Sequence, residues 1–359
     1  MIFAIKCNSL LDLTFRPDKL RLPNYKCNIM KNLLLGALLL GLFTSCKDND
    51  NISFTQNDDL HEKSKSHSFK RTCPSEELRQ AALRSNPQLM QKYELLEMQT
   101  KQFANNMSLG KVLSDGTIEI PVVVNIISNS ETGDISNTRI EQQINILNAD
   151  FAGTNTDASD IPSEFDAVKA GNTKIKFKLA DVKRKNSSQS SWSTNDNMKK
   201  SSTDGIDATD PNSYLNIWVV GEISGGILGY ATFPESAGQW NDGVVISSMC
   251  FGKTGATAPF NLGRTTTHEV GHYLNLRHIW GDANCGDDQV SDTPTQPSPN
   301  YGTPSYPLMT SCDGDDSSVM FMNFMDYVDD SSMYMFTKGQ KTRAQAVVAA
   351  DGARAGLRN

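Results

Sequence analysis

The sequence predicts a mixed α/β domain followed by a C-terminal part rich in loops. Three observations predict this class: an apolar strand leading into a helix, several further strands, and a late helix with closely spaced histidines. The chain has 359 residues, 38% hydrophobic and 21% charged, which suffices for one large domain with flanking segments. Its formal net charge of −7 argues against binding nucleic acid.

The individual elements follow from the spacing of apolar residues. Residues 118–127 form a continuous apolar run, whereas the apolar positions of 140–148 fall at helical spacing and 174–179 alternate as in a strand. A long region rich in Gly, Pro, Asp and Ser then precedes a final helix. The complete prediction is strands at 118–127, 174–179, 215–220 and 243–247, helices at 140–148, 264–276 and 337–350, and irregular structure at 281–318.

The N-terminal part has the features of an export signal. We expect residues 1–29 to be an upstream extension outside the true protein and residues 30–45 to be the signal peptide, whose apolar run 33–43 is too short to span a bilayer. The following Cys46 ends a segment, Phe43-Thr44-Ser45-Cys46, that resembles the lipobox of bacterial lipoproteins. It predicts a lipid-anchored protein on the surface of a Gram-negative bacterium, and a plain signal peptide with a chance cysteine is the alternative.

Two segments separate this signal from the main domain. Residues 46–72 are polar and predict a flexible tether. Residues 73–110 have helical periodicity broken near Ser85-Asn86-Pro87, and we expect a small helical pro-segment. Residues 111–359 are then the catalytic domain, with an upper subdomain to about residue 280 and a lower subdomain at 281–359.

The segment from Thr267 to His278 contains the most informative residues. His268 and His272 are four positions apart, so a helix presents both imidazoles on one face beside Glu269. Zinc favours imidazole nitrogen, and a catalytic site uses three protein ligands. His278 can be the third ligand if the chain turns back near Asn275, a residue type that tolerates positive φ.

A chance occurrence of the motif is the alternative, because short motifs often occur on ordinary helices. The histidine count argues against it. The chain has five histidines, of which His61 and His67 lie in the polar tether and the other three are those of the motif.

The run GRTTTHEVGHYLNLRHIWGD resembles the pappalysin-type metzincins, most of all their ulilysin-like bacterial members. Asn323-Phe324-Met325-Asp326-Tyr327 resembles the Met-turn of that family. The resemblance covers residues 118–350 and implies a metzincin fold, in which a twisted mixed sheet is accompanied by an active-site helix and a backing helix. Asn275 departs from the pattern, since the family has Gly there.

The resemblance also implies a reaction and its residues. It implies a zinc-dependent endopeptidase acting on proteins or peptides, with Zn²⁺ held by His268, His272 and His278. Glu269 would be the general base, Met325 would lie beneath the metal, and Tyr327 would contact the metal or the oxyanion.

Two further residues are assigned roles by the resemblance. Asp330 would form the base of the S1′ pocket and select Arg or Lys after the scissile bond, with a solvated acidic turn as the alternative. Cys73 would bind the zinc as a thiolate and keep the enzyme latent, and a free thiol or a disulfide with Cys250 is the alternative. Activation would then require cleavage after Cys73, with the bonds before Lys101 and Lys111 as candidates.

The irregular region contains a possible second metal site. Residues 285–294 are dense in oxygen ligands, and the family binds calcium in the matching stretch. Asp288, Thr293 and the Ser291 carbonyl are the predicted ligands, and an acidic surface loop is the alternative. Cys285 and Cys312 match the family's disulfide. The competing function is a catalytically silent surface lipoprotein that keeps this fold and binds a host or matrix protein.

Overall fold

The structure is a computed structural model that describes residues 70–108, 116–129, 134–312 and 315–358. The chain divides into two compact units, and the described residues belong to Lys65–Asn359. The predicted signal peptide, Cys46 and nearly all of the predicted tether lie outside the described residues. Within the described ranges, none of the helices combines the length and apolarity needed to cross a bilayer.

A five-stranded mixed sheet forms the framework, with the strand order β2-β1-β3-β5-β4. Four strands are parallel, and β4 pairs antiparallel with β5 at one edge. The predicted strands are all present, and β4 is an additional one, too short for its apolar pattern to be recognised. The strands are β1 (Ile118–Ser128), β2 (Ile175–Asn186), β3 (Leu215–Val220), β4 (Gly229–Ala231) and β5 (Val244–Ser247).

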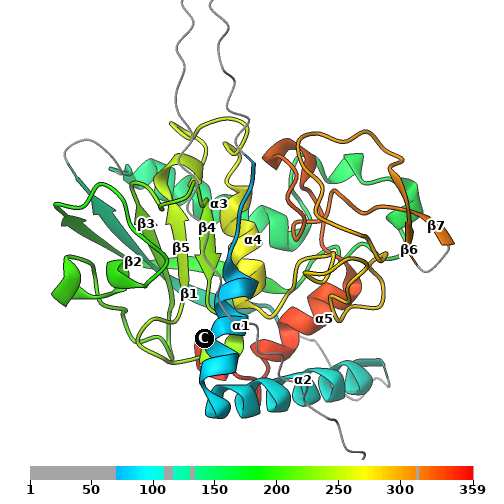
Figure 1. The fold of residues 1–359 in the computed structure, drawn as a ribbon, viewed down its shortest axis with the longest axis horizontal. Coiled ribbons are helices and arrows are strands. Elements are labelled where there is room, and N and C mark those ends of the chain that lie inside the picture. Colours follow the sequence, from blue (N-terminus) through cyan, green and yellow to red (C-terminus); the bar gives the residue numbers. More distant parts are fainter. Residues whose placement is uncertain (1–69, 109–115, 130–133, 313–314, 359) are drawn as a thin grey trace, which may run out of the picture. The chain divides into compact units, whose positions relative to one another are not determined.

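Two helices pack on this sheet and bring the histidine motif to its edge. Helix α3 (Asn137–Ala152) contacts β2, and α4 (Arg264–Tyr273) contacts β4, β5 and α3 (Figure 1). The central strand β3 is buried on both faces: Ile217 joins the main core, whereas Trp218 joins a second cluster with Met198. The edge strand β2 has exposed residues between its buried ones. The result is a mixed sheet with an active-site helix and a backing helix, as the resemblance implied.

The segment predicted as a pro-segment consists of two helices, α1 (Ser75–Ser85) and α2 (Pro87–Ser108). The break lies at Asn86, which is extended because a proline follows. Helix α2 packs against the C-terminal helix α5 (Lys338–Val347), whose start is fixed by a capping box of Thr337 and Gln340 (Figure 1). These helices therefore rest on the catalytic part of the chain.

The structure differs from the prediction in two places. Helix α4 ends at Tyr273, earlier than expected, because the chain turns before Leu276. The region predicted as irregular contains a hairpin of β6 (Met309–Cys312) and β7 (Asp315–Ser318), which lacks the apolar alternation that identifies a strand.

The structure shows whether Cys73 is a free thiol or is paired with Cys250, the alternatives left open by the sequence. Cys285 and Cys312 form a disulfide, whereas Cys73 and Cys250 are free and buried. A disulfide between Cys73 and Cys250 was therefore a wrong alternative. Cys250 lies in the core, where its Sγ is 3.3 Å from the carbonyl oxygen of Leu228.

Candidate active site

A left-handed turn after α4 returns the chain to the histidine motif. Asn275 has φ +70°, as expected from a residue type that tolerates this conformation. The Leu276 amide donates to the Gly271 carbonyl over 2.9 Å, which closes the helix end. The turn carries His278 back toward His268 and His272, so the predicted geometry is present.

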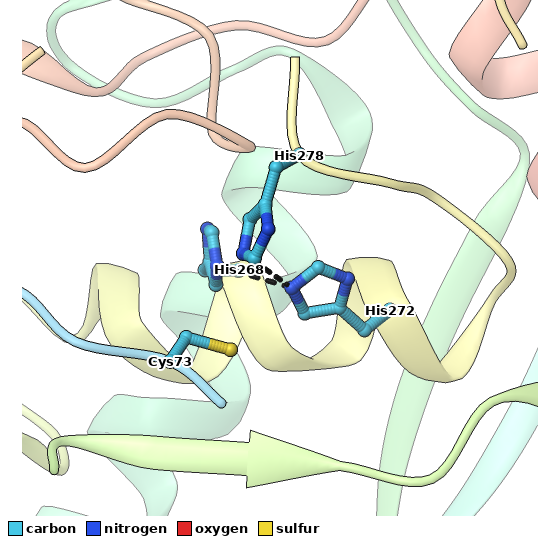
Figure 2. Close-up of side chains that lie close together, drawn as sticks. All are labelled: Cys73, His268, His272 and His278. Atoms are coloured by element: carbon cyan, nitrogen blue, oxygen red, sulfur yellow. Dashed lines mark hydrogen bonds between the residues drawn. The ribbon is translucent and has the colours of Figure 1, made fainter. Parts of the chain in front are cut away.

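The three imidazoles converge through their Nε2 atoms (Figure 2). His272 Nε2 lies 3.2 Å from His268 Nε2 and 3.1 Å from His278 Nε2. Each Nδ1 meets an oxygen that can only accept: the Phe324 carbonyl at 2.7 Å, the Leu276 carbonyl at 2.8 Å and the Asp282 carboxylate at 2.6 Å. We therefore assign the proton to Nδ1 in all three rings.

This tautomer leaves three Nε2 lone pairs facing one another in the protein interior. Lone pairs at such separations repel one another, whereas a cation bound between them would be coordinated by all three. Burial also lowers the pKa of His268 and His272 well below the usual value, which keeps both rings neutral, the form that binds metals. The donor set therefore fits a zinc ion.

Cys73 completes a group of four potential metal ligands. Its Sγ atom and one nitrogen from each imidazole all lie within 4.8 Å of one another, and Figure 2 shows the thiol directed at the three rings. Burial, followed by the charge of Glu269, raises the pKa of the thiol well above its usual value in the protein alone. A metal ion reverses this balance, because a coordinating thiol loses its proton.

Glu269 lies beside the converging nitrogens but is occupied by the pro-segment. Its Oε2 accepts a hydrogen bond from the Ser75 hydroxyl over 3.1 Å and lies 3.2 Å from Cys73 Sγ. Burial raises the pKa of Glu269 to about 7, which suits a group that must take up and release a proton near neutrality. The Ser75 oxygen also accepts from the Ala231 amide of β4, so one residue blocks both the carboxylate and the strand edge.

Tyr327 forms two hydrogen bonds with the backbone of Cys73. Its hydroxyl donates to the Cys73 carbonyl over 2.8 Å and accepts from the Cys73 amide over 3.2 Å. Met325 is fully buried, and a Cβ atom at Gly271 of α4 would overlap its sulfur. Met325 therefore packs closely beneath α4, and this approach requires glycine at position 271.

Asp330 is buried rather than solvated, contrary to the alternative of an acidic surface turn. One carboxylate oxygen accepts from the amides of Leu262, at 2.8 Å, and Arg264, at 3.2 Å, at the start of α4. The other oxygen accepts over 2.7 Å from Arg71, which lies at the end of the segment predicted as a tether. Arg71 is buried, so the prediction of a flexible tether is wrong at this residue. Arg71 also donates to Thr265 Oγ1 at 2.9 Å, so a basic side chain covers Asp330.

A second contact joins the pro-segment to the back of the left-handed turn. Glu97 of α2 forms a buried ion pair with Arg343 of α5, and Arg277 lies 3.9 Å away. Arg343 also donates to the Asn275 carbonyl over 2.6 Å, while the Asn275 side-chain amide lies 3.4 Å from Glu97 Oε1. Asparagine in place of the family's glycine thus supplies a donor that reaches the pro-segment.

The predicted calcium ligands lie in a separate region of the structure. Asp288 and Thr293 are adjacent, because the Thr293 hydroxyl donates to the Asp288 carboxylate over 2.9 Å. Burial raises the pKa of Asp288 to about 7. They line a cavity of about 190 Å³ next to Cys285, and Ser291 is exposed nearby.

Several residues of the site were not identified from the sequence. Arg71 acts from the end of the predicted tether, Ser75 and Glu97 act from the pro-segment, and Asp282 contacts His278. Arg71 had a recognisable signal, because it precedes Cys73 by two positions and is the side-chain type expected to suit Asp330. The others depend on long-range packing that spacing alone does not encode.

The fold and site together define a metallopeptidase with its pro-segment in place, and comparison with known proteins agrees. The sequence profile of peptidase family M43, described as "Pregnancy-associated plasma protein-A", matches residues 200–349. An "Extracellular metalloprotease" of Verticillium alfalfae is 32% identical over 255 residues, which cover 67% of this chain and 80% of the relative. Another, of Pyricularia oryzae, is 31% identical over 280 residues, covering 76% and 89%.

Solved structures are also similar to this chain. Mature mirolysin of Tannerella forsythia, in complex with a cleaved peptide, superposes with a TM-score of 0.65 at 41% identity, covering 68% of this chain and 96% of that one. A mutant of promirolysin from the same organism gives a TM-score of 0.70 at 38% identity, covering 80% and 97%. The chain belongs to the M43, or pappalysin, family of zinc metallopeptidases, and it is a metalloendopeptidase of the metzincin fold.

Proposed function

We propose that this chain is a latent zinc endopeptidase in which His268, His272 and His278 hold the metal. The observation that carries the proposal is the convergence of three unprotonated Nε2 atoms beside a buried glutamate. Nothing in the described residues favours the alternative of a silent binding protein, because the three histidines and Glu269 are all present and assembled.

The reaction follows from the positions of the side chains. When bound, Zn²⁺ lowers the pKa of water to about 7 and polarises the scissile carbonyl. Glu269 takes the proton from the attacking water and passes it to the leaving amine. The Tyr327 hydroxyl, which now donates to the Cys73 carbonyl, is placed to donate to the oxyanion of a substrate once the pro-segment has left.

Latency is proposed to rest on Cys73 and its neighbours. The Cys73 thiolate would be the fourth protein ligand of the metal, and the Ser75 hydroxyl is hydrogen-bonded to the general base Glu269. Since the Ser75 oxygen also accepts from the Ala231 amide, the pro-segment covers the strand edge along which an extended substrate can pair. Cleavage in the segment between Cys73 and β1, with the bonds before Lys101 and Lys111 as candidates, would release the site.

The proposed specificity is for Arg or Lys immediately after the scissile bond. What supports the proposal is the buried ion pair of Arg71 and Asp330, in which a guanidinium already contacts this carboxylate. Peptides that differ only at P1′ test this proposal: cleavage before Arg or Lys should exceed cleavage before Leu or Ala at least tenfold. Equal rates would refute the role of Asp330.

Two further features belong to the proposal, a calcium site and a lipid anchor. Asp288, Thr293 and the Ser291 carbonyl would bind Ca²⁺, which predicts a calcium-dependent rise in melting temperature that is lost in Asp288→Ala. Cys46 would carry a lipid that anchors the exported protein to the cell surface. Incorporation of labelled fatty acid into the wild type, and its loss in Cys46→Ala, tests the anchor.

The catalytic assignment is tested by Glu269→Ala. We expect this variant to bind one Zn²⁺ per chain, like the wild type, and to lose nearly all proteolysis of a casein-type substrate. The matched control is Glu141→Ala on the exposed side of α3, which should keep full activity. Full activity of Glu269→Ala would overturn the mechanism.

A further inference from the structure

His278 differs from the other two histidines in how it is held. His268 and His272 project from the rigid helix α4, and each donates its Nδ1 proton to a backbone carbonyl. His278 lies on the segment after the turn, and its Nδ1 contacts the Asp282 carboxylate at 2.6 Å. In the described part of the chain, Asp282 is the sole carboxylate that contacts an Nδ1 atom of these three rings.

The backbone is shaped to bring Asp282 to this position. The Gly281 amide donates to the His278 carbonyl over 2.9 Å, and both Gly281 and Asp282 have positive φ, at +60° and +55°. Such conformations are rare for residues with a Cβ, although Asp tolerates them better than most. A Cβ at Gly281 would collide with the backbone of Asp287, so the turn is also closely packed from outside.

A second contact fixes the plane of the same imidazole. The Trp280 ring stacks on His278 with centroids 4.3 Å apart and an angle of 7° between the planes. Trp280 also meets Tyr327 edge to face, with centroids 4.7 Å apart. Trp280 therefore limits tilting of His278, whereas the hydrogen bond to Asp282 limits rotation within the plane and selects the tautomer.

We propose that Asp282 is a positioning residue for the metal site: it holds His278 in the Nδ1-protonated form and makes its Nε2 a stronger donor to Zn²⁺. The inference rests on the proposed zinc site. Its physical basis is that a carboxylate attracts the Nδ1 proton and returns electron density to the ring, which strengthens the bond from the opposite nitrogen to a metal. A ligand on a loop needs this support more than a ligand on a helix.

Two substitutions separate the side chain from the backbone. Asp282→Gly removes the carboxylate and accepts positive φ without strain, whereas Asp282→Asn keeps an oxygen acceptor and removes the charge. The purified precursor is used, so that Cys73 is the same in every variant. The Kd for Zn²⁺ is measured by competition with a chromogenic chelator, and the visible spectrum is recorded with Co²⁺ in the site.

We expect Asp282→Gly to weaken Zn²⁺ binding by about 10–100-fold and to change the Co²⁺ spectrum. Asp282→Asn should lose less, and Glu141→Ala, which removes an exposed carboxylate elsewhere, should match the wild type. If Asp282→Gly does not fold, the Kd of Asp282→Asn decides, with weaker binding than the wild type expected. Wild-type Kd and spectrum in the folded Asp282 variants would overturn the inference.

The same measurements separate this inference from the proposed function. A wild-type chain that fails to bind Zn²⁺ would refute the zinc site itself. Tight binding by the wild type together with unchanged binding by the variants would refute only the role of Asp282. A purely structural role of Asp282 would lower the melting temperature of the metal-free protein and leave the Kd for Zn²⁺ unchanged, which also overturns the inference.

Discussion

Arg71 and Asp330 form an ion pair at 2.7 Å in which both side chains are almost fully buried, although they are separated by most of the sequence. The pair places the Arg71 guanidinium over a carboxylate that also accepts hydrogen bonds from the amides of Leu262 and Arg264, at the start of α4. A substrate side chain can contact Asp330 only after Arg71 has left, because the guanidinium covers this carboxylate. If Asp330 selects the P1′ residue as proposed, specificity and latency depend on the same contact.

Arg71→Ala should weaken latency strongly. Removing one partner of a buried ion pair costs about 3–5 kcal/mol, so the open form of the precursor should become roughly 100- to 4,000-fold more populated. The measurement is the rate at which the purified precursor gains activity and shortens. Lys70→Ala removes a neighbouring exposed basic residue and serves as the control. Identical rates in the two variants would show that the pair does not maintain latency.

Glu97→Gln should loosen the second attachment of the pro-segment. Glu97 is held by Arg343, and Arg343 contacts the carbonyl of Asn275, so the variant leaves two arginines without their carboxylate. We expect the free energy that holds α2 against α5 to fall by about 2–3 kcal/mol. An added protease should then cleave this helix faster. Glu94→Gln, on the exposed side of α2, is the matched control. Equal cleavage of the two variants would contradict this prediction.

Loss of the disulfide should destabilise the catalytic part. Cys285 and Cys312 are 27 residues apart in the sequence, for which the chain-entropy relation gives about 3.5 kcal/mol. The double variant Cys285→Ser with Cys312→Ser should lose this amount in the free energy of unfolding, measured with denaturant. Treating the wild type with a thiol reductant should have the same effect, whereas unchanged stability in both cases would show that the bond contributes little.

The stability should also depend on pH through Asp326. Burial raises the pKa of this carboxyl to about 6, in spite of hydrogen bonds from Gln296, Asn300 and the Tyr327 amide. The folded state then binds more protons than the unfolded state between about pH 4 and pH 6, so this contribution to stability is lost as the pH rises through 6. Unfolding by denaturant at pH 4.5 and pH 7 should show a smaller pH dependence in Asp326→Asn. An unchanged dependence would count against this assignment.

The sequence predicted most of the sheet and the core of the site for clear reasons. Long apolar runs and the i, i+4 histidines are local patterns, and Asn275 has the positive φ expected at the turn. Tyr327 and Met325 were placed by resemblance, and both lie at the site.

What the sequence could not predict depends on contacts between distant segments. Ser75 reaches Glu269 and Ala231 only because the pro-segment crosses the edge strand β4, which is itself too short to be identified. Glu97 and Arg343 meet because α2 packs on α5. Asp282 reaches His278 because Gly281 and Asp282 both have positive φ. The sequence did not predict this turn, because it has no Asn-Gly pair there.

The segment Arg71-Thr72-Cys73 has a consequence for inhibitor chemistry. It carries a guanidinium that pairs with Asp330 and a thiol directed at the three imidazoles. The backbone between them is fixed by the Tyr327 hydroxyl, which donates to the Cys73 carbonyl and accepts from the Cys73 amide. A short peptidomimetic with the same two groups at the same spacing would combine a metal-binding group with a guanidinium that pairs with Asp330. The precursor thus contains a template for selective compounds against its own mature form.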